Sequence, residues 1–223
     1  GWWDTVAFTE EAKKEGVIAK NFMGDAFSDE MKEAVIKYIK EEFGGKIDLL
    51  IYSLASGVRT DPKTGITYRS ALKSTTNEIE GPTINLEKET IEVGKMEVAT
   101  KEELESTVKV MGGEDWKLWI NGLDEAGVLD NGFKTVAYSY LGPKVTYGIY
   151  KEGTIGAAKR DLEQTSNDLN DFLKNKYNGE AYVSLSKALM TRASAVIPVF
   201  PLYAALLYKI MKEKGIHEGT IEQ

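Results

Sequence analysis

Residues 29–52 limit the fold of this chain more than any other segment, because a helical hydrophobic period is followed there by a short apolar run. In residues 29–43 apolar side chains recur at helical spacing, and charged side chains occupy the other face. Ser28 is a suitable N-cap for this helix and Gly44 a suitable stop. The run Ile47–Tyr52 is typical of a strand covered on both faces. A helix, a tight turn and a buried strand in this order predict an α/β fold with a parallel sheet.

The segment from Gly57 to Thr100 does not continue this alternation of helix and strand. Residues 61–65 carry a turn signal, and residues 83–98 are β-prone residues interrupted by charges. We therefore expect a small antiparallel insertion in this part of the chain. The pattern leaves open whether the insertion is a lid over a site or a plain hairpin.

Regular elements return after residue 100. Residues 101–126 have helical spacing with an expected break at Gly112–Gly113. An apolar stripe in the second half of this segment is typical of a core rather than of a cofactor site: Trp116, Trp119, Ile120 and Leu123. The remaining predicted elements are strands 134–141 and 181–185 and helices 154–177, 186–196 and 202–214.

The scarcity of metal-binding and nucleophilic side chains narrows the possible chemistry. The chain has no cysteine, which excludes disulfides and thiolate chemistry and is typical of a reducing cytoplasm. Its single histidine, His217, leaves little basis for a histidine-rich metal site or a Ser/His/Asp triad. A formal charge of −7 argues against a general nucleic-acid or polyphosphate surface but allows a local site for a cofactor or a coenzyme A tail. The longest apolar stretch, residues 195–208, is shorter than the roughly 20 residues that span a bilayer, so no membrane span is expected.

Tyr150 and Lys159 form a candidate catalytic pair if the chain bends between them. In one straight helix they would lie about 13 Å apart along the axis and on opposite sides. A helix that begins at Thr154 removes this conflict, since Tyr150 then lies on the preceding loop and Lys159 in the second turn. A lysine ammonium beside a tyrosine favours the phenolate, which makes the tyrosine an acid or an oxyanion donor. The spacing alone does not distinguish this pair among eleven tyrosines.

Seven segments, in the same order along the chain, carry a family resemblance. They are NFMGDAFSDE (21–30), IYSLAS (51–56), RTDP (59–62), VMGGEDW (110–116), AYSYLGP (137–143), GTIG (153–156) and TRASAVIP (191–198). Together they resemble the trans-2-enoyl-CoA reductases and the related long-form enoyl-acyl-carrier-protein reductases. The resemblance spans nearly the whole chain.

The resemblance implies a Rossmann-like parallel sheet with flanking helices, a variant of the short-chain dehydrogenase fold. It implies NADH-dependent reduction of the carbon–carbon double bond of a trans-2-enoyl thioester. The family's Tyr-x8-Lys pair corresponds to Tyr150 and Lys159, with Lys159 binding the nicotinamide ribose and favouring the ionised or strongly polarised tyrosine. The family's substrate-contacting tyrosine corresponds to Tyr140.

Further cofactor contacts follow from the same resemblance. Asp25 and Ala26 are expected at the adenine, a Ser-Leu-Ala step beside the cofactor, and a Leu-Met-Thr step at the nicotinamide. The Ser-Leu-Ala motif corresponds to Ser53, Leu54 and Ala55, and the Leu-Met-Thr motif corresponds to Leu189, Met190 and Thr191. Taken singly, Asp25 also fits a plain turn, Ser53 to Ala55 a strand end, and Thr191 a solvated helix residue. On this basis we divide the chain into part of a cofactor-binding α/β domain (1–56), a lid-like insertion (57–100) and the remainder of the domain with the catalytic pair (101–223).

The sequence also departs from the family pattern. It contains no G-x-G-x-x-G fingerprint, so the family's first strands and glycine-rich loop are expected before Gly1, and its end after Gln223. Gly57 and Ser74 to Thr76 differ from the usual lid segments. Three alternatives therefore stay open: a carrier-protein-specific reductase, a non-catalytic fragment unable to bind cofactor, and a generic carbonyl reductase, which the missing Tyr-x3-Lys at Tyr150 disfavours. The substrate partner is a CoA or carrier-protein thioester, and the pattern does not separate a monomer from a dimer.

Overall fold

The centre of the molecule is a parallel β-sheet. The computed structural model describes residues 2–54, 56–85, 87–190, 194, 197 and 199–219. In this part of the chain the sheet has the strand order β1 (Ile47–Tyr52), β6 (Leu129–Ser139) and β7 (Glu180–Leu185). Both pairings are parallel. The carboxyl ends of all three strands therefore meet at one edge, which is where open α/β sheets bind ligands. The predicted α/β architecture is confirmed.

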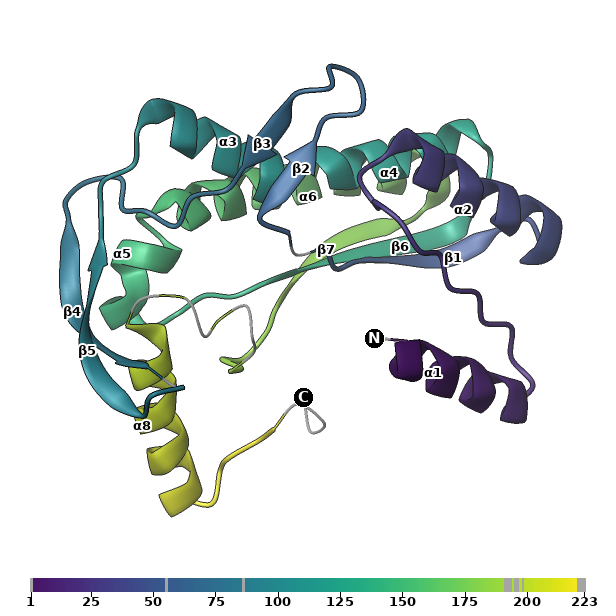
Figure 1. Cartoon of the computed structure of the whole chain (residues 1–223). Coiled ribbons are helices and arrows are strands. Elements are labelled where there is room, and N and C mark those ends of the chain that lie inside the picture. Colours follow the sequence, from purple (N-terminus) through teal and green to yellow (C-terminus); the bar gives the residue numbers. More distant parts are fainter. Residues whose placement is uncertain are drawn as a thin grey trace.

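The helices that build the main core lie on one side of this sheet, as Figure 1 shows. They are α2 (Asp29–Glu42), α4 (Glu114–Glu125) and α6 (Thr154–Tyr177), and α3 (Lys101–Met111) packs against α6 on the same side. The predicted apolar stripe of α4 is buried, with Trp116 and Ile120 both 0% exposed. Trp116, Ile120 and Leu123 of this stripe pack with Phe133 of β6 and Leu169 of α6 in one hydrophobic cluster.

The opposite face of the sheet is largely uncovered by the described residues. Leu49 and Ile51 of β1 are 50% and 51% exposed, and Tyr138 and Tyr182 of the neighbouring strands are also exposed. The expectation that residues 47–52 are covered on both faces was therefore wrong for this part of the chain. Alternate strand residues point to opposite faces, and the helices of the main core cover only one of them.

Several helix boundaries follow the predicted capping signals. The Ser28 hydroxyl accepts a hydrogen bond from the Met31 N–H at the start of α2. The break at Gly112–Gly113 separates α3 from α4, and α6 begins and ends at the predicted residues. Gly113 lies so close to Thr165 of α6 that a Cβ atom there would overlap its side chain. The absence of a side chain at Gly113 therefore allows α4 and α6 to come into close contact.

The insertion is antiparallel, as predicted. It consists of two hairpins, β2 (Val58–Thr60) with β3 (Thr67–Arg69), and β4 (Ile79–Asn85) with β5 (Thr90–Met96). The β4–β5 ribbon lies beside α8 (Phe200–Glu213), which ends before Gly215, close to the predicted stop.

Two elements differ from the sequence prediction. The helix α1 (Trp2–Lys14) was not predicted, because its apolar residues form no stripe and only Ala12 is buried. The helix predicted for 186–196 is not formed by residues 186–190, which have no regular structure. There the Tyr208 hydroxyl of α8 accepts from the Met190 N–H and donates to the Ala188 carbonyl, so these main-chain groups pair with a side chain instead of with a helix. Residues 191–193, 195 and 196 lie outside the described part. No helix among the described residues is long and apolar enough to cross a membrane.

Candidate active site

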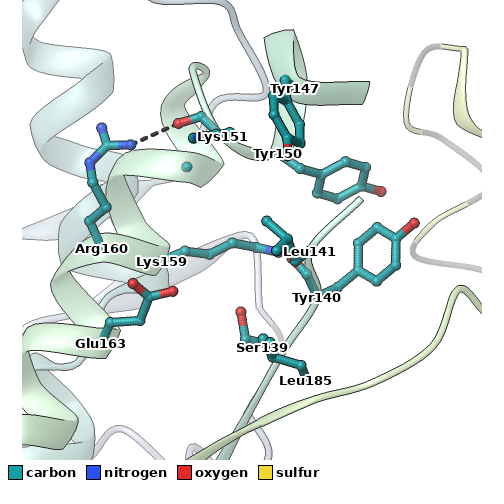
Figure 2. Close-up of a pocket in the computed structure, with 11 residues that line it drawn as sticks. Ser139, Tyr140, Leu141, Tyr147, Tyr150, Lys151, Lys159, Arg160, Glu163 and Leu185 are labelled. Atoms are coloured by element: carbon teal, nitrogen blue, oxygen red, sulfur yellow. Dashed lines mark hydrogen bonds between the residues drawn. The ribbon is translucent and has the colours of Figure 1, made fainter. Parts of the chain in front are cut away.

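A hollow of about 370 Å³ opens where the carboxyl ends of β6 and β7 meet the start of α6 (Figure 2). The chain segment after β6 provides one wall, the one-turn helix α5 (Tyr147–Tyr150) another, and the first turns of α6 the third. The lining residues are Ser139, Tyr140, Leu141, Tyr147, Tyr150, Lys151, Gly156, Lys159, Arg160, Glu163 and Leu185. All three residues predicted for catalysis and substrate binding therefore line one cavity.

A sharp turn between α5 and α6 brings Tyr150 and Lys159 together. Gly153 is the N-cap of α6, and a Cβ atom there would crowd the carbonyl oxygens of Ile149 and Lys73. The Thr154 N–H donates to the Lys73 carbonyl at 2.9 Å, which holds the start of α6 against the insertion. Tyr150 is the last residue of α5 and not a loop residue as predicted. The bend nevertheless places the Lys159 Nζ 5.0 Å from the centre of the Tyr150 ring.

Tyr140 and Tyr150 belong to a cluster of aromatic rings. Their ring centres are 4.9 Å apart in an edge-to-face arrangement, and Phe200 of α8 packs edge-on against both. Met96 of the insertion is part of the same buried cluster, and Met190 packs against it. Such packing fixes the orientation of the two phenol groups.

Burial dominates the electrostatics of Tyr150 and Lys159, the candidate catalytic pair. It raises the pKa of Tyr150, and the neighbouring Tyr140 raises it further. Burial also lowers the pKa of Lys159 to about 8, against a smaller opposing effect of Glu163. In this structure Lys159 donates its hydrogen bond to the Tyr140 carbonyl oxygen, and the effect of burial on the Tyr150 pKa outweighs any favouring of the phenolate by the ammonium. Tyr150 is therefore a protonated hydroxyl at neutral pH and a hydrogen-bond donor.

A second, smaller hollow of about 170 Å³ lies at the carboxyl end of β1. It is lined by Ala26, Val35, Leu50, Ile51, Tyr52, Ser53, Leu54 and Trp119. Three of the residues predicted to contact the cofactor, Ala26, Ser53 and Leu54, therefore lie together. The two hollows are at the same edge of the sheet, at the ends of adjacent strands.

The other predicted cofactor residues are placed differently. Asp25 does not line the second hollow; its carboxylate accepts from the Phe27 N–H at 2.9 Å, as a turn residue does. Met190 lies by the aromatic cluster of the first hollow, and the Leu189 carbonyl accepts from the Ser194 hydroxyl. Ala55 and Thr191 lie outside the described residues.

Sequence reasoning missed one face of α6. Gly156, Lys159, Arg160 and Glu163 all line the first hollow, and their spacing of three and four residues places them on one side of a helix. Once Lys159 was assigned to the site, this helical spacing could have predicted that the other three residues lie beside it. Arg160 also donates to the Lys151 carbonyl at 2.7 Å, which joins α6 to the turn after α5 (Figure 2).

The sequence matches one protein-family model along its whole length. The match covers residues 1–223, and the family is described as the trans-2-enoyl-CoA reductase catalytic region. The chain belongs to this family.

Relatives within the trans-2-enoyl-CoA reductase family carry two kinds of name. The chain is 57% identical to a trans-2-enoyl-CoA reductase [NADH] of Clostridium beijerinckii and 55% identical to an enoyl-[acyl-carrier-protein] reductase [NADH] 2 of Photobacterium profundum. Each alignment covers 100% of this chain and 56% of the relative. The chain thus spans about half the length of the curated relatives it matches.

Solved structures confirm the Rossmann-type fold of this family. The crystal structure of a Clostridium acetobutylicum trans-2-enoyl-CoA reductase in complex with NADH superposes with a TM-score of 0.94 at 53% identity. The superposition covers 98% of this chain and 55% of that one. The predicted fold class and family resemblance are therefore confirmed.

Proposed function

We propose that the protein reduces the carbon–carbon double bond of a trans-2-enoyl thioester with NADH. The observation that carries this proposal is the first hollow, in which a protonated Tyr150 and a buried Lys159 face one space at the carboxyl edge of a parallel sheet. The names of the family's members support the same reaction, since those relatives are called NADH-dependent enoyl reductases.

The residues present fit the two ends of a dinucleotide. The second hollow has mainly apolar walls, which suit a flat base, and Ser53 and Leu54 border it. In the first hollow the Lys159 ammonium has three N–H donors. Among the described residues it donates to one acceptor, the Tyr140 carbonyl oxygen. Its remaining donors suit the hydroxyls of a ribose. This sequence contains no glycine-rich fingerprint that would bind the pyrophosphate, so we assign only the sites for the two ends of the dinucleotide.

The chain's own residues would orient the substrate and stabilise developing charge. When bound, NADH would supply a hydride to Cβ of the double bond, and a proton delivered to Cα would complete the reduction. Tyr150 would donate a hydrogen bond to the thioester oxygen, where negative charge develops during the reduction. Its raised pKa keeps the donated proton in place at neutral pH. Tyr140, whose ring packs edge-on against Tyr150, would contact the substrate beside that oxygen.

The insertion supports the proposed role as a substrate lid. Leu72, Ile79 and Met96 all come from residues 57–100 and pack in the cluster around Tyr150. A movement of the insertion would therefore change the surroundings of the thioester. We propose the same division into residues 1–56, 57–100 and 101–223 on this basis. The cysteine-free sequence supports a cytoplasmic location for the reaction.

Oxidation of NADH by the full-length protein tests the proposed function. We expect consumption of NADH with both crotonyl-CoA and a crotonyl carrier-protein thioester, and the ratio of the two kcat/KM values identifies the preferred carrier. An intact-mass measurement on the same sample establishes which residues the protein contains, and NADPH serves as the cofactor control. A folded protein that neither binds nor oxidises NADH would support the non-catalytic alternative.

The pH dependence of kcat/KM for NADH tests the role of Lys159. Below pH about 8 the Lys159 ammonium is charged and above it the amine is neutral, so kcat/KM should fall as the pH rises through this value. Tyr150 does not contribute to this fall, because burial raises its pKa. Lys159→Arg, which keeps its charge, should flatten the profile, whereas Lys151→Met should retain the fall. A fall that persists in Lys159→Arg would show that another group titrates.

A further inference from the structure

A buried ion pair lies beside the second hollow and has no part in the chemistry described above. Lys32 of α2 and Asp115 of α4 form a salt bridge of 2.9 Å, with side chains only 7% and 2% exposed. The second carboxylate oxygen of Asp115 accepts from the Tyr52 hydroxyl at 3.1 Å. The three residues come from segments far apart in the sequence, so the network exists only in the folded protein.

This network connects the two walls of the second hollow. Tyr52 is the last residue of β1, immediately before Ser53 and Leu54 on one wall. On the other side, the Lys32 ammonium also donates to the Phe27 carbonyl at 2.7 Å. The adjoining Ala26 carbonyl accepts from the Trp119 indole N–H at 3.2 Å, and Trp119 is one turn from Asp115 on α4.

Burial of the Lys32–Asp115 pair has an unfavourable desolvation free energy, which argues that the pair has a specific role. Desolvation of two buried charges offsets much of their attraction, so a buried ion pair is weak evidence for stability alone. Burial raises the pKa of Asp115, and the hydrogen bond from Lys32 opposes that rise. The pair instead fixes positions. One Asp115 carboxylate oxygen binds Lys32 and the other binds Tyr52, and these two residues are connected to different walls of the second hollow.

We propose that Asp115 is a positioning residue for the cofactor site. Through Tyr52 it holds the end of β1, and through Lys32 it holds the Ala26–Phe27 segment, so that the second hollow keeps the width that one end of NADH requires. This inference rests on the proposed function, because it takes the second hollow as part of the NADH site. Asp115 itself does not line the hollow and acts through its two partners.

The same helix provides a matched control. Asp124 of α4 also accepts hydrogen bonds from a lysine and a tyrosine, Lys176 and Tyr177. This second network lies at the opposite end of α4, has a half-exposed Lys176 side chain, and touches neither hollow. Asp124→Asn therefore makes the same chemical change in the same helix without reaching the proposed cofactor site.

Steady-state kinetics of Asp115→Asn, Tyr52→Phe and Asp124→Asn in the full-length protein test the inference. We expect Asp115→Asn to raise KM for NADH by about tenfold with kcat within about twofold of wild type, which corresponds to lost ground-state binding. Tyr52→Phe removes only the tie to β1 and should raise KM by about threefold while keeping the fold. Asp124→Asn should leave both constants unchanged.

The outcomes separate the inference from the proposed function. A purely structural role would lower the melting temperature and the active fraction, and hence kcat, while KM for NADH stayed constant. That result in both Asp115→Asn and Tyr52→Phe overturns the inference and leaves the proposed function in place. If Asp115→Asn fails to fold, the KM of Tyr52→Phe decides alone. A folded wild-type protein that does not bind NADH overturns the proposed function and the inference together.

Discussion

Tyr150→Phe should lower kcat for enoyl-thioester reduction by about 10²- to 10³-fold, the usual effect of removing one oxyanion donor. The substitution removes only the hydroxyl, so the ring keeps its edge-on contacts with Tyr140 and Phe200. We therefore expect KM for NADH and the melting temperature to change little. Steady-state rates with crotonyl-CoA and a thermal unfolding curve measure both effects.

Tyr147→Phe is the matched control for this substitution. Tyr147 lies on the same short helix and lines the same hollow, and its ring lies beneath the Lys151 ammonium. Loss of its hydroxyl should leave kcat within about twofold of wild type, as for ordinary surface substitutions. Near-normal turnover by Tyr150→Phe would remove Tyr150 from the proposed mechanism, and a large loss in Tyr147→Phe would transfer the role to that residue.

Lys159→Met should lower kcat/KM for NADH by about 10- to 100-fold, the range expected for a lost hydrogen bond from a charged donor. Methionine has a similar length and no charge, so it fills the space without the desolvation that lowers the pKa of Lys159. The melting temperature should consequently stay constant or rise. This combination of lost activity and retained stability is typical of a functional group held in an unfavourable environment.

Lys151→Met controls for the general effect of removing a cation from the first hollow. The Lys151 Nζ lies 4.7 Å from the centre of the Tyr147 ring and is exposed. Its removal should change kcat/KM by less than about threefold. If both lysine variants lost activity equally, the hollow would depend on net charge rather than on the position of Lys159.

The sequence predicted those parts of the fold that depend on local signals. The boundaries of α2 and α6 followed from capping residues and helical spacing, and the Gly112–Gly113 break from two adjacent glycines. The irregular course of residues 186–190 could not be predicted, because it depends on the distant Tyr208 hydroxyl. The uncovered sheet face was missed for a related reason: an apolar strand pattern does not say which elements cover it.

In the candidate site, too, local features could be predicted from the sequence and features that depend on distant residues could not. Helix geometry explained how Tyr150 and Lys159 could meet, and the family resemblance selected them from many similar residues. The direction of the Tyr150 pKa shift was not predictable, since it depends on the burial that the aromatic cluster creates. Nor was the pairing of Asp115 with Lys32 and Tyr52, because 83 and 63 residues separate them along the chain.

The close contact of α4 with α6 has a consequence for ligand length. Gly113 meets Thr165 without an intervening side chain, and its N–H donates to the Asp161 carboxylate at 2.9 Å. The helix that carries Lys159 and the helix that carries Asp115 are therefore joined directly, and the span between the two hollows is set by the scaffold. A ligand held at both ends must match that span. A mononucleotide, which lacks the second half of a dinucleotide, can fill only one hollow at a time and gains nothing from the other.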